Sequence, residues 1–492
     1  MVEHGSDEYA VRLEKLRRIA AAGVDPYPAK SAVTHTIARL HEHFAGLQKS
    51  GESVSIAGRL KALRGHGGAL FADLEQDGKT MQLHLKKDVL GGDSFAFFNA
   101  NIDRGDFLQV SGTAFVTKMG QESIAVSSFV LLTKALAPLP EKWHGLTDTE
   151  IRYRKRYLDL ISNAEVRAIF ETRSRVVEKI RNFFSAEGFM EVDTPMLQPV
   201  PGGATARPFV THHNALDVDL YLRIAPELYL KRLVVGGFDR VFEIARCFRN
   251  EGIDHLHNPE FTQIEAYCAY ADYEDLMSLV ERLLPELVAA AKPGTTAVPF
   301  GDTVIDFKGP YQRITFRDAI LEYSGFDIEA YPDRAALAKA AAEKGVAVAD
   351  SDGRGDIMDN LFKKFARPKI VNPTFVINHP IELSPLAKKL RRDPRYVERF
   401  QLLLGAGTEL VNAFSELNDP LDQRERFMEQ EKLRAGGNVE AQRVDEDFLD
   451  ALATGMPPTA GLGMGIDRLV AILTNSHSLK EVILFPTLRP EK

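Results

Sequence analysis

The segment that most constrains this chain is residues 241–273, VFEIARCFRNEGIDHLHNPEFTQIEAYCAYADY. Residues 241–245 alternate between two faces as a strand does, and residues 261–267 alternate in the same way. The polar stretch between them is too long for a tight turn. The segment therefore predicts two antiparallel strands joined by a loop that closes over another group.

Charged side chains on this hairpin need an explanation. Arg249, Glu251 and Glu265 carry charges that a sheet interior rejects unless each charge finds a partner. The alternative is a hairpin with one solvated face, where such charges need no partner. The hairpin taken alone leaves both interpretations open.

Three motifs in a fixed order carry a family resemblance. In the hairpin, FRNEG followed by HNPEFT resembles motif 2 of the class II aminoacyl-tRNA synthetases, in the lysyl version of bacterial type and subclass IIb. Gly188–Leu197, GFMEVDTPML, resembles motif 1, and Gly461–Arg468, GLGMGIDR, resembles motif 3. The likeness runs in order from about Tyr9 to Arg489 and so covers nearly the whole chain.

The resemblance implies an α+β fold. An antiparallel-sheet class II catalytic domain would follow an N-terminal five-stranded OB β-barrel. We expect an N-terminal helical region at 1–50, an OB-fold anticodon-binding domain at 51–135, a linker at 136–162 and the catalytic domain at 163–492.

The pattern of residues 53–134 independently favours an OB barrel. Five short alternating runs appear there, with a helical insert at Phe95–Ile102 between the third and the fourth. The runs are Val54–Arg59, Ala69–Leu74, Met81–Leu85, Phe107–Phe115 and Ser123–Leu132. Such barrels bind single-stranded nucleic acid by stacking bases on aromatic rings beside a basic groove.

The resemblance assigns three anticodon-binding residues in this barrel. Phe71 would stack on an anticodon base, Gln82 would read the edge of a base, and Arg64 would hold a phosphate or a base. Without the resemblance, Phe71 is equally well interpreted as a core residue.

The formal net charge of −8 excludes general attraction to nucleic acid, so RNA contacts must come from local basic patches. Arg12, Lys15, Arg17 and Arg18 share one side of the first expected helix, as a solvated face or as contacts to RNA phosphate. The run at 152–157, RYRKRY, suits a groove that follows an RNA backbone or a hinge that packs its tyrosines.

The chain has two cysteines, Cys247 and Cys268, without metal-ligand spacing. Their scarcity argues against a disulfide framework and against a structural zinc site, and fits a reducing compartment. The sequence has no N-terminal apolar run and no apolar stretch long enough to span a bilayer. We expect a cytoplasmic protein that does not contact a membrane.

The resemblance implies a reaction. The chain would activate L-lysine with ATP to lysyl-adenylate and transfer the lysyl group to the 3′ end of tRNA(Lys), as a homodimer. When a carboxylate attacks the α-phosphate, charge grows on the phosphoryl oxygens, so positioning and electrostatic stabilisation matter most. Arginine pairs bidentately with carboxylate and phosphate. Arg249 and Arg468 are therefore the catalytic candidates.

The resemblance also implies how ATP binds. Arg249 would bridge the lysine carboxylate and the α-phosphate, whereas Arg468 would lie over the adenine and reach the γ-phosphate. Phe261 would stack on the other face of the adenine. The remaining nucleotide-binding residues implied by the family are Glu251, His257, Asn258, Glu409 and Gly465.

A divalent metal is expected because the α- and β-phosphates need neutralising, and Mg²⁺ binds through few carboxylates. Glu409 is the best protein ligand for it. The lysyl family usually has a second acid after an Arg-Phe pair, where this chain has Gln401 after Arg399-Phe400. We expect weaker metal affinity, or one metal fewer, rather than loss of activity.

Carboxylates would select the amino acid. Glu227 and the backbone near Gly203 would bind the α-amino group, and Glu416 with Tyr267 would hold the ε-ammonium. The other residues of the implied lysine site are Arg249, Glu265, Asn412 at the substrate carboxylate and Phe414 on the aliphatic stem. An uncharged substrate would leave a buried carboxylate unpaired, which costs on the order of several kcal/mol.

Two alternatives have sequence features against them. An aspartyl- or asparaginyl-type synthetase of the same subclass should offer cations where this chain has three glutamates. A non-catalytic RNA-binding paralogue should have lost Arg249, Glu251 or Arg468, and all three are present.

Overall fold

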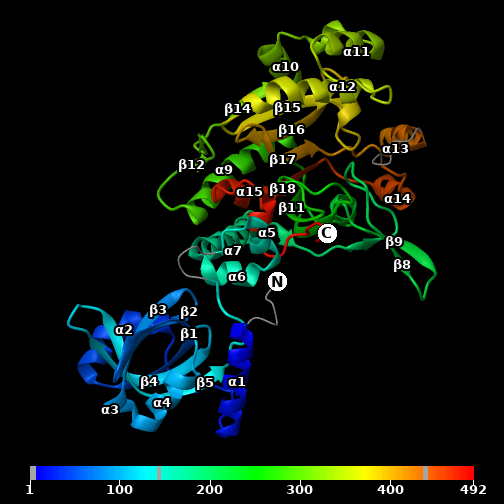
Figure 1. Ribbon diagram of the computed structural model, residues 1–492. Helices are drawn as coiled ribbons and strands as arrows, with labels where there is room; N and C mark the ends of the chain where they lie inside the picture. Colours follow the sequence, from blue (N-terminus) through cyan, green and yellow to red (C-terminus); the bar gives the residue numbers. More distant parts are fainter. Residues whose placement is uncertain (1–6, 141–145, 436–441, 492) are drawn as a thin grey trace. The chain divides into compact units, whose positions relative to one another are not determined.

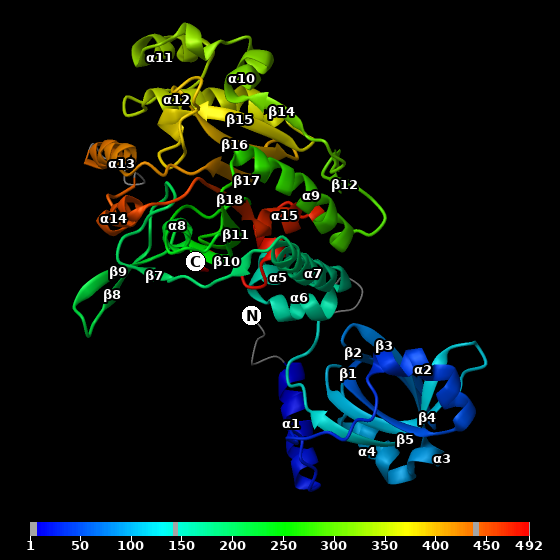
Figure 2. The ribbon, with the colours of Figure 1, turned by 180° about the vertical axis from the view of Figure 1, so that it is seen from behind.

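A computed structural model describes residues 7–140, 146–435 and 442–491. The chain divides into two compact units, one made of residues 1–149 and 157–164 and the other of residues 150–156 and 165–492. Figures 1 and 2 show the elements of both units from opposite sides.

The first unit contains a closed five-stranded barrel with the strand order β1-β2-β3-β5-β4. Its strands are β1 (Ser53–His66), β2 (Ala69–Gln76), β3 (Lys79–Lys86), β4 (Phe107–Val116) and β5 (Glu122–Thr133), and its helices are α1 (Asp7–Ala21), α2 (Ile37–Ser50), α3 (Lys87–Leu90) and α4 (Gly92–Asn101). The barrel closes through the parallel pairing of β3 with β5. The predicted OB barrel with its helical insert is confirmed.

Alternation along the strands fills the inside of the barrel. Leu74 and Leu83 are fully buried, and buried side chains lie two residues away on the same strand, Ala72 for the first and Met81 and Leu85 for the second. β1 is longer than predicted because its pairing with β2 continues to His66, opposite Ala69.

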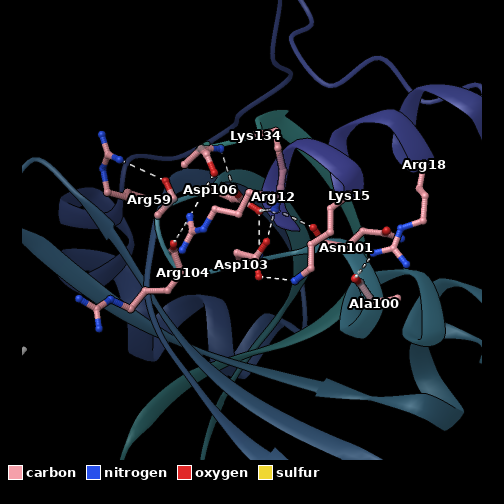
Figure 3. Close-up of polar contacts among 12 residues, drawn as sticks. Arg12, Lys15, Arg18, Arg59, Ala100, Asn101, Asp103, Arg104, Asp106 and Lys134 are labelled. Atoms are coloured by element: carbon pink, nitrogen blue, oxygen red, sulfur yellow. Dashed lines mark hydrogen bonds and ion pairs between the residues drawn. The ribbon is translucent and has the colours of Figure 1, made fainter. Parts of the chain in front are cut away.

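Helix α1 is fixed to the barrel by a cluster of charged side chains (Figure 3). Arg12 is buried and donates hydrogen bonds to the carbonyl oxygens of Arg104 and Ala135, each at 3.1 Å. Lys15 Nζ lies 2.5 Å from Asp103 Oδ1. Lys134 completes the cluster, with Nζ 2.5 Å from Asp103 Oδ2 and 2.8 Å from Asp106 Oδ2.

A solvated face and a contact to RNA phosphate are both wrong for Arg12 and Lys15, because these two side chains contact the barrel. Arg17 remains exposed, 3.7 Å from Glu14. The sequence did not reveal this contact because Asp103 lies far along the chain, in the segment just before β4.

The second unit is organised around an eight-stranded sheet with the order β14-β15-β16-β17-β18-β11-β10-β6. These strands are β6 (Met190–Glu191), β10 (Arg240–Phe248), β11 (Glu260–Ala269), β14 (Gln312–Thr315), β15 (Thr374–Pro380), β16 (Tyr396–Leu404), β17 (Thr408–Ser415) and β18 (Thr459–Gly465). All pairs are antiparallel except β14–β15 and β10–β6 at the two ends. The expected antiparallel class II fold is confirmed.

One face of this sheet packs on helices α7 (Ala164–Ala186), α9 (Tyr273–Ala291) and α15 (Ile466–Leu473) (Figures 1 and 2). The sheet residues in that core include Phe242, Ile264, Ala266, Leu462 and Met464. Because side chains alternate along a strand, the residues between them point to the opposite face. That opposite face carries the predicted substrate residues.

Smaller elements complete the second unit. They are α5 (Thr149–Arg154), β7 (Leu197–Gln198), β8 (Val210–His213), β9 (Val218–Leu222), α8 (Glu227–Val235), β12 (Ala297–Phe300), β13 (Thr303–Asp306), α10 (Phe316–Ser324), η1 (Ile328–Ala330), α11 (Arg334–Glu343), α12 (Arg354–Leu361), η2 (Phe362–Ala366), η3 (Arg367–Lys369), η4 (Ile381–Leu383), α13 (Pro420–Ala435), α14 (Glu446–Thr454) and α16 (Leu479–Val482). Helix α6 (Arg156–Ser162) belongs to the first unit from Tyr157 onward. Among the described residues, no helix combines the length and apolar character needed to cross a bilayer.

Within the basic run 152–157, Arg156 packs into the interior of the second unit. Its guanidinium is almost fully buried and donates to the carbonyl oxygens of Lys480 and Leu484 at 2.6 and 3.1 Å. An RNA-groove role is therefore wrong for Arg156.

Lys134→Met should loosen the barrel, because it leaves the carboxylates of Asp103 and Asp106 without their shared cation. Breaking a buried ion pair from one side costs about 3–5 kcal/mol, which corresponds to an increase of about a hundredfold or more in opening. Hydrogen exchange of peptides from β4 and β5 in the full-length chain measures this opening. Lys118→Met, an exposed lysine of the same unit, is the control. Equal protection in both variants would contradict the expectation.

Candidate active site

The central hairpin forms as predicted and lies inside the sheet. β10 and β11 pair antiparallel, with Glu243 opposite Glu265 and Ile244 opposite Ile264. Ile244 and Ile264 belong to or pack on the hydrophobic core, so the two glutamates face the other side. The hairpin is therefore not solvated on its charged face: Glu243 and Glu265 are both buried.

Three neighbouring strands bring the predicted lysine-site residues side by side. β11 pairs with β18, and β18 pairs with β17, so residues far apart in the sequence become cross-strand neighbours on one face. The two adjacent rows are Glu265–Gly463–Asn412 and Tyr267–Gly461–Phe414.

The glycines of motif 3 make room for these side chains. A Cβ at Gly461 would collide with Glu416 Oε1 and with the ring of Tyr267. A Cβ at Gly463 would have Glu265 Cγ at 3.7 Å, which is an ordinary contact distance. Gly461 is thus the position where the close approach of a carboxylate and a phenol requires glycine.

Helix α8 supplies the third carboxylate. Glu227 is its first residue and is buried. Gly203 lies directly on it, since a Cβ on Gly203 would lie 2.9 Å from Glu227 Cβ. Gly203 also has a φ of +85°, a conformation that favours glycine. The structure therefore brings Gly203 and Glu227 together as the resemblance implied.

A lysine of the chain itself lies among these carboxylates. Lys231 is fully buried, and its Nζ is 2.6 Å from Glu227 Oε1 and 2.5 Å from Glu416 Oε2. Nζ also lies 5.5 Å from the centre of the Phe414 ring. We did not predict Lys231; its spacing of four residues from Glu227 is the signal that could have revealed it, because such a pair shares one face of a helix.

Burial dominates the electrostatics of the site. Burial, and after it the nearby charge of Glu227, raises the pKa of Glu265 to about 8. Burial also raises the pKa of Glu227, against the opposing effect of Lys231. Glu265 accepts hydrogen bonds from Gln263 Nε2 at 2.6 Å and from the Tyr267 hydroxyl at 3.0 Å.

The two candidate arginines follow strands β10 and β18, which lie on either side of β11 in the sheet. Arg249 follows β10, and its guanidinium carbon is 5.0 Å from the centre of the Phe261 ring. Among the described residues, no hydrogen-bond partner reaches its buried Nε. Arg468, in the first turn of α15, donates from Nη1 to the carbonyl oxygen of Glu409 at 3.1 Å. Burial lowers the pKa of Arg468, and the nearby charge of Arg249 contributes to this.

Glu409 contacts the residue that replaces the expected acid. Gln401 Nε2 donates to Glu409 Oε2 at 3.1 Å, and Gln401 Oε1 lies 3.2 Å from His379 Nε2. His379 is buried, which holds its pKa well below its usual range. Within the described chain, no group of three or more His, Cys, Asp or Glu side chains could hold a metal on its own.

The loop of motif 2 is open at two of its predicted residues. Glu251 and His257 are exposed, and His257 Nδ1 lies 2.9 Å from Asp254 Oδ2. Asn258 is buried, and its amide donates to the carbonyl oxygen of Glu260 at 2.5 Å. Gly465 is the N-cap of α15, beside the side chain of Arg468.

The three predicted anticodon residues share the outer side of the barrel sheet. Phe71 pairs with Arg64 on β1 and with His84 on β3, and it stacks on the His84 ring at 4.4 Å between centroids. Phe71 is thus not a core residue of the barrel. Arg64 lies 2.8 Å from Asp73, which is opposite Gln82. The sequence analysis did not predict that His84 stacks on Phe71, because this contact depends on the register of β2 and β3.

Comparisons with known proteins agree with this architecture. A family model described as tRNA synthetases class II (D, K and N) matches residues 148–489. A model described as an OB-fold nucleic acid binding domain matches residues 54–132. The first range contains the sheet residues described above, and the second contains Arg64, Phe71 and Gln82.

Relatives match over almost their entire length. The lysine–tRNA ligase of Carboxydothermus hydrogenoformans is 50% identical over 480 residues, covering 98% of this chain and 97% of that protein. The lysine–tRNA ligase of Moorella thermoacetica is 48% identical over 491 residues, covering 100% and 99%. That of Pelotomaculum thermopropionicum is 48% identical over 484 residues, covering 98% and 95%. The chain belongs to the lysine–tRNA ligase family of class II tRNA synthetases.

For this class II synthetase, the buried carboxyl of Glu265 gives a pH-dependent stability. It keeps its proton to about pH 8, whereas in the unfolded chain its pKa is near 4.5. The native state therefore binds more protons in this interval, and the free energy of unfolding falls as pH rises through it.

Glu265→Gln should remove this dependence, so the melting temperature of the variant should rise relative to wild type as pH increases. The shift corresponds to a contribution on the order of several kcal/mol. Melting temperatures of the full-length chain between about pH 5 and about pH 9 measure it. Glu260→Gln, an exposed residue of the same strand, is the control. Parallel pH curves for wild type and Glu265→Gln would contradict the expectation.

Proposed function

We propose that this chain is a lysine–tRNA ligase whose amino-acid site is the group of Glu227, Glu265 and Glu416. The observation that supports it best is the joint burial of these three acidic side chains over one face of the sheet, beside Arg249, whose buried Nε has no hydrogen-bond partner among the described residues. Buried carboxylates need cations, and lysine brings two ammonium groups. Aspartate or asparagine would bring a carboxylate or an amide to the same carboxylates.

In the proposed binding mode, the α-ammonium contacts Glu227 near Gly203, and the ε-ammonium contacts Glu416 and Tyr267. Glu416 Oε1 supports this, because it is buried and has no hydrogen-bond partner among the described residues. Glu265 holds Tyr267 by the hydroxyl hydrogen bond of 3.0 Å. Asn412, whose Oδ1 accepts from Arg399 Nε at 2.8 Å, supports the substrate carboxylate, and Phe414 packs on the stem.

ATP is proposed to lie between the two arginines. Arg249 bridges the lysine carboxylate and the α-phosphate, which positions the attacking oxygen and stabilises the charge that develops. Phe261 and Arg468 enclose the adenine, and Arg468 extends towards the γ-phosphate. Gly465 leaves space at the start of α15, while Glu251, His257 and Asn258 line the nucleotide from the loop.

Class II synthetases of this family generally use Mg²⁺ with ATP. Glu409 is proposed as its protein ligand, which fits a metal that takes most of its ligands from phosphates and water. When bound, the metal neutralises phosphate charge. Gln401 is engaged with both His379 and Glu409, so it orients the Glu409 carboxylate in this proposal.

For tRNA(Lys), the proposed contact is the outer face of the OB barrel. Phe71 and His84 offer a stacking surface for anticodon bases, with Gln82 and Arg64 beside it. The homodimer and the cytoplasmic setting stay predictions from the family resemblance.

ATP–pyrophosphate exchange tests the proposed function. Exchange should require lysine and should not occur with aspartate or asparagine. Arg249→Ala should reduce the exchange rate by about a hundredfold to a thousandfold, because an interaction with the developing charge is lost. Arg246→Ala, which removes an exposed neighbour paired with Glu260 at 3.4 Å, is the control. Exchange with aspartate alone, or none with any amino acid, would refute the proposal.

Gln401→Glu should increase the affinity for Mg²⁺. A second carboxylate beside Glu409 adds one negative charge near the metal. The Mg²⁺ concentration for half-maximal exchange should therefore fall by a factor on the order of several. Metal binding measured by calorimetry with a non-hydrolysable ATP analogue gives a second readout. An identical Mg²⁺ dependence in both proteins would show that Gln401 does not influence the metal.

A further inference from the structure

Lys231 has no assigned role, and it is the most deeply buried charge near the proposed lysine site. Its exposed fraction is 0%, and one ammonium group serves two carboxylates, Glu227 and Glu416, at 2.6 and 2.5 Å. Those two carboxylates are the ones proposed to bind the two ammonium groups of the substrate.

The chemistry of the site depends on this one positive charge. Three carboxylates without water would repel one another and take up protons, since burial disfavours their charged form. A protonated carboxyl attracts an ammonium group far less than a carboxylate does. Burial raises the pKa of Glu227 and of Glu416, and the charge of Lys231 is the largest influence that opposes this in both. Lys231 contacts one oxygen of each carboxyl, and Glu416 Oε1 has no hydrogen-bond partner among the described residues.

We propose that Lys231 is a positioning residue of the amino-acid site, which keeps Glu227 and Glu416 charged and oriented for the ammonium groups of the substrate. This proposal rests on the proposed function and deepens it. Lys231 acts only through its two partners and does not touch the substrate.

Charged, polar and aromatic side chains from other elements face Lys231, Glu227 and Glu416. Glu265 and Tyr267 face it from β11, and Arg399 faces it from β16. Phe414 and Phe448 lie against the ammonium with their rings, at 5.5 and 5.8 Å, and do not titrate. A substitution of Lys231 leaves these side chains in place, so a pH profile that differs from that of wild type reports on the coupled carboxyls of the site, which are Glu227, Glu416 and Glu265.

The decisive variant is Lys231→Met, which keeps the length of the side chain and removes its charge. In ATP–pyrophosphate exchange with the full-length chain, the KM for lysine should rise at least about tenfold near pH 7, because each pKa unit of added protonation is a factor of ten. The KM for ATP should stay within about twofold. The increase in the lysine KM should shrink as pH rises, because the carboxyls of Glu227 and Glu416 then lose their protons in the variant.

Two further variants separate positioning from general structure. Lys231→Arg keeps the charge and should keep the pH profile of the wild type. Lys134→Met makes the same change at a buried lysine that also bridges two carboxylates, in the barrel (Figure 3). It should leave the lysine KM and its pH profile unchanged, since exchange does not need tRNA.

The outcomes distinguish the two proposals. If wild type exchanges with lysine and Lys231→Met has a pH profile parallel to it, Lys231 is a packing residue and the inference is wrong. If wild type does not exchange with lysine, the proposed function itself fails. Should Lys231→Met not fold, as judged by circular dichroism, Lys231→Gln is measured with the same expectation and the same contradicting result.

Discussion

The structure of the second unit depends on one constraint, which is that several charges are buried on a single face of an antiparallel sheet. Removing a carboxylate from water is costly unless a cation or hydrogen-bond donors replace the water. Glu243 meets this requirement within the protein, through Arg223 at 2.5 Å and the Thr194 hydroxyl at 2.6 Å. Glu265 meets it by keeping its proton and by accepting hydrogen bonds from Gln263 and Tyr267, whereas Glu416 has, among the described residues, only the ammonium of Lys231, which agrees with the proposal that this face accepts a cationic ligand.

The sheet explains why this arrangement can be rigid. Motif 2 provides β10 and β11, motif 3 provides β18, and β17 brings its residues beside them in a fixed register. The helices on the other face hold these strands through a continuous hydrophobic core. Gly461 lets Glu416 and Tyr267 approach the sheet closely, so the shape of the site follows from backbone positions as much as from side chains.

Much of this was predictable from the sequence, and the exceptions share a cause. The hairpin and the OB barrel followed from alternation along the sequence, and the grouping of Glu265, Tyr267, Asn412 and Phe414 was implied by the family resemblance. The roles of Lys15, Lys134 and Lys231 did not, because each contacts a carboxylate from a distant part of the chain: Asp103, Asp106 and Glu416 respectively. A basic residue in a sequence looks the same whether it faces solvent or a buried acid, and periodicity does not distinguish the two.

The most direct test of the central claim is a crystal structure of the full-length chain with L-lysine and a non-hydrolysable ATP analogue. The expected result is one lysine molecule on the sheet face, with its two ammonium groups on Glu227 and Glu416 and its carboxylate on Arg249. Lysine bound elsewhere, or Glu227 and Glu416 held by Lys231 alone while the ligand contacts neither, would contradict the claim.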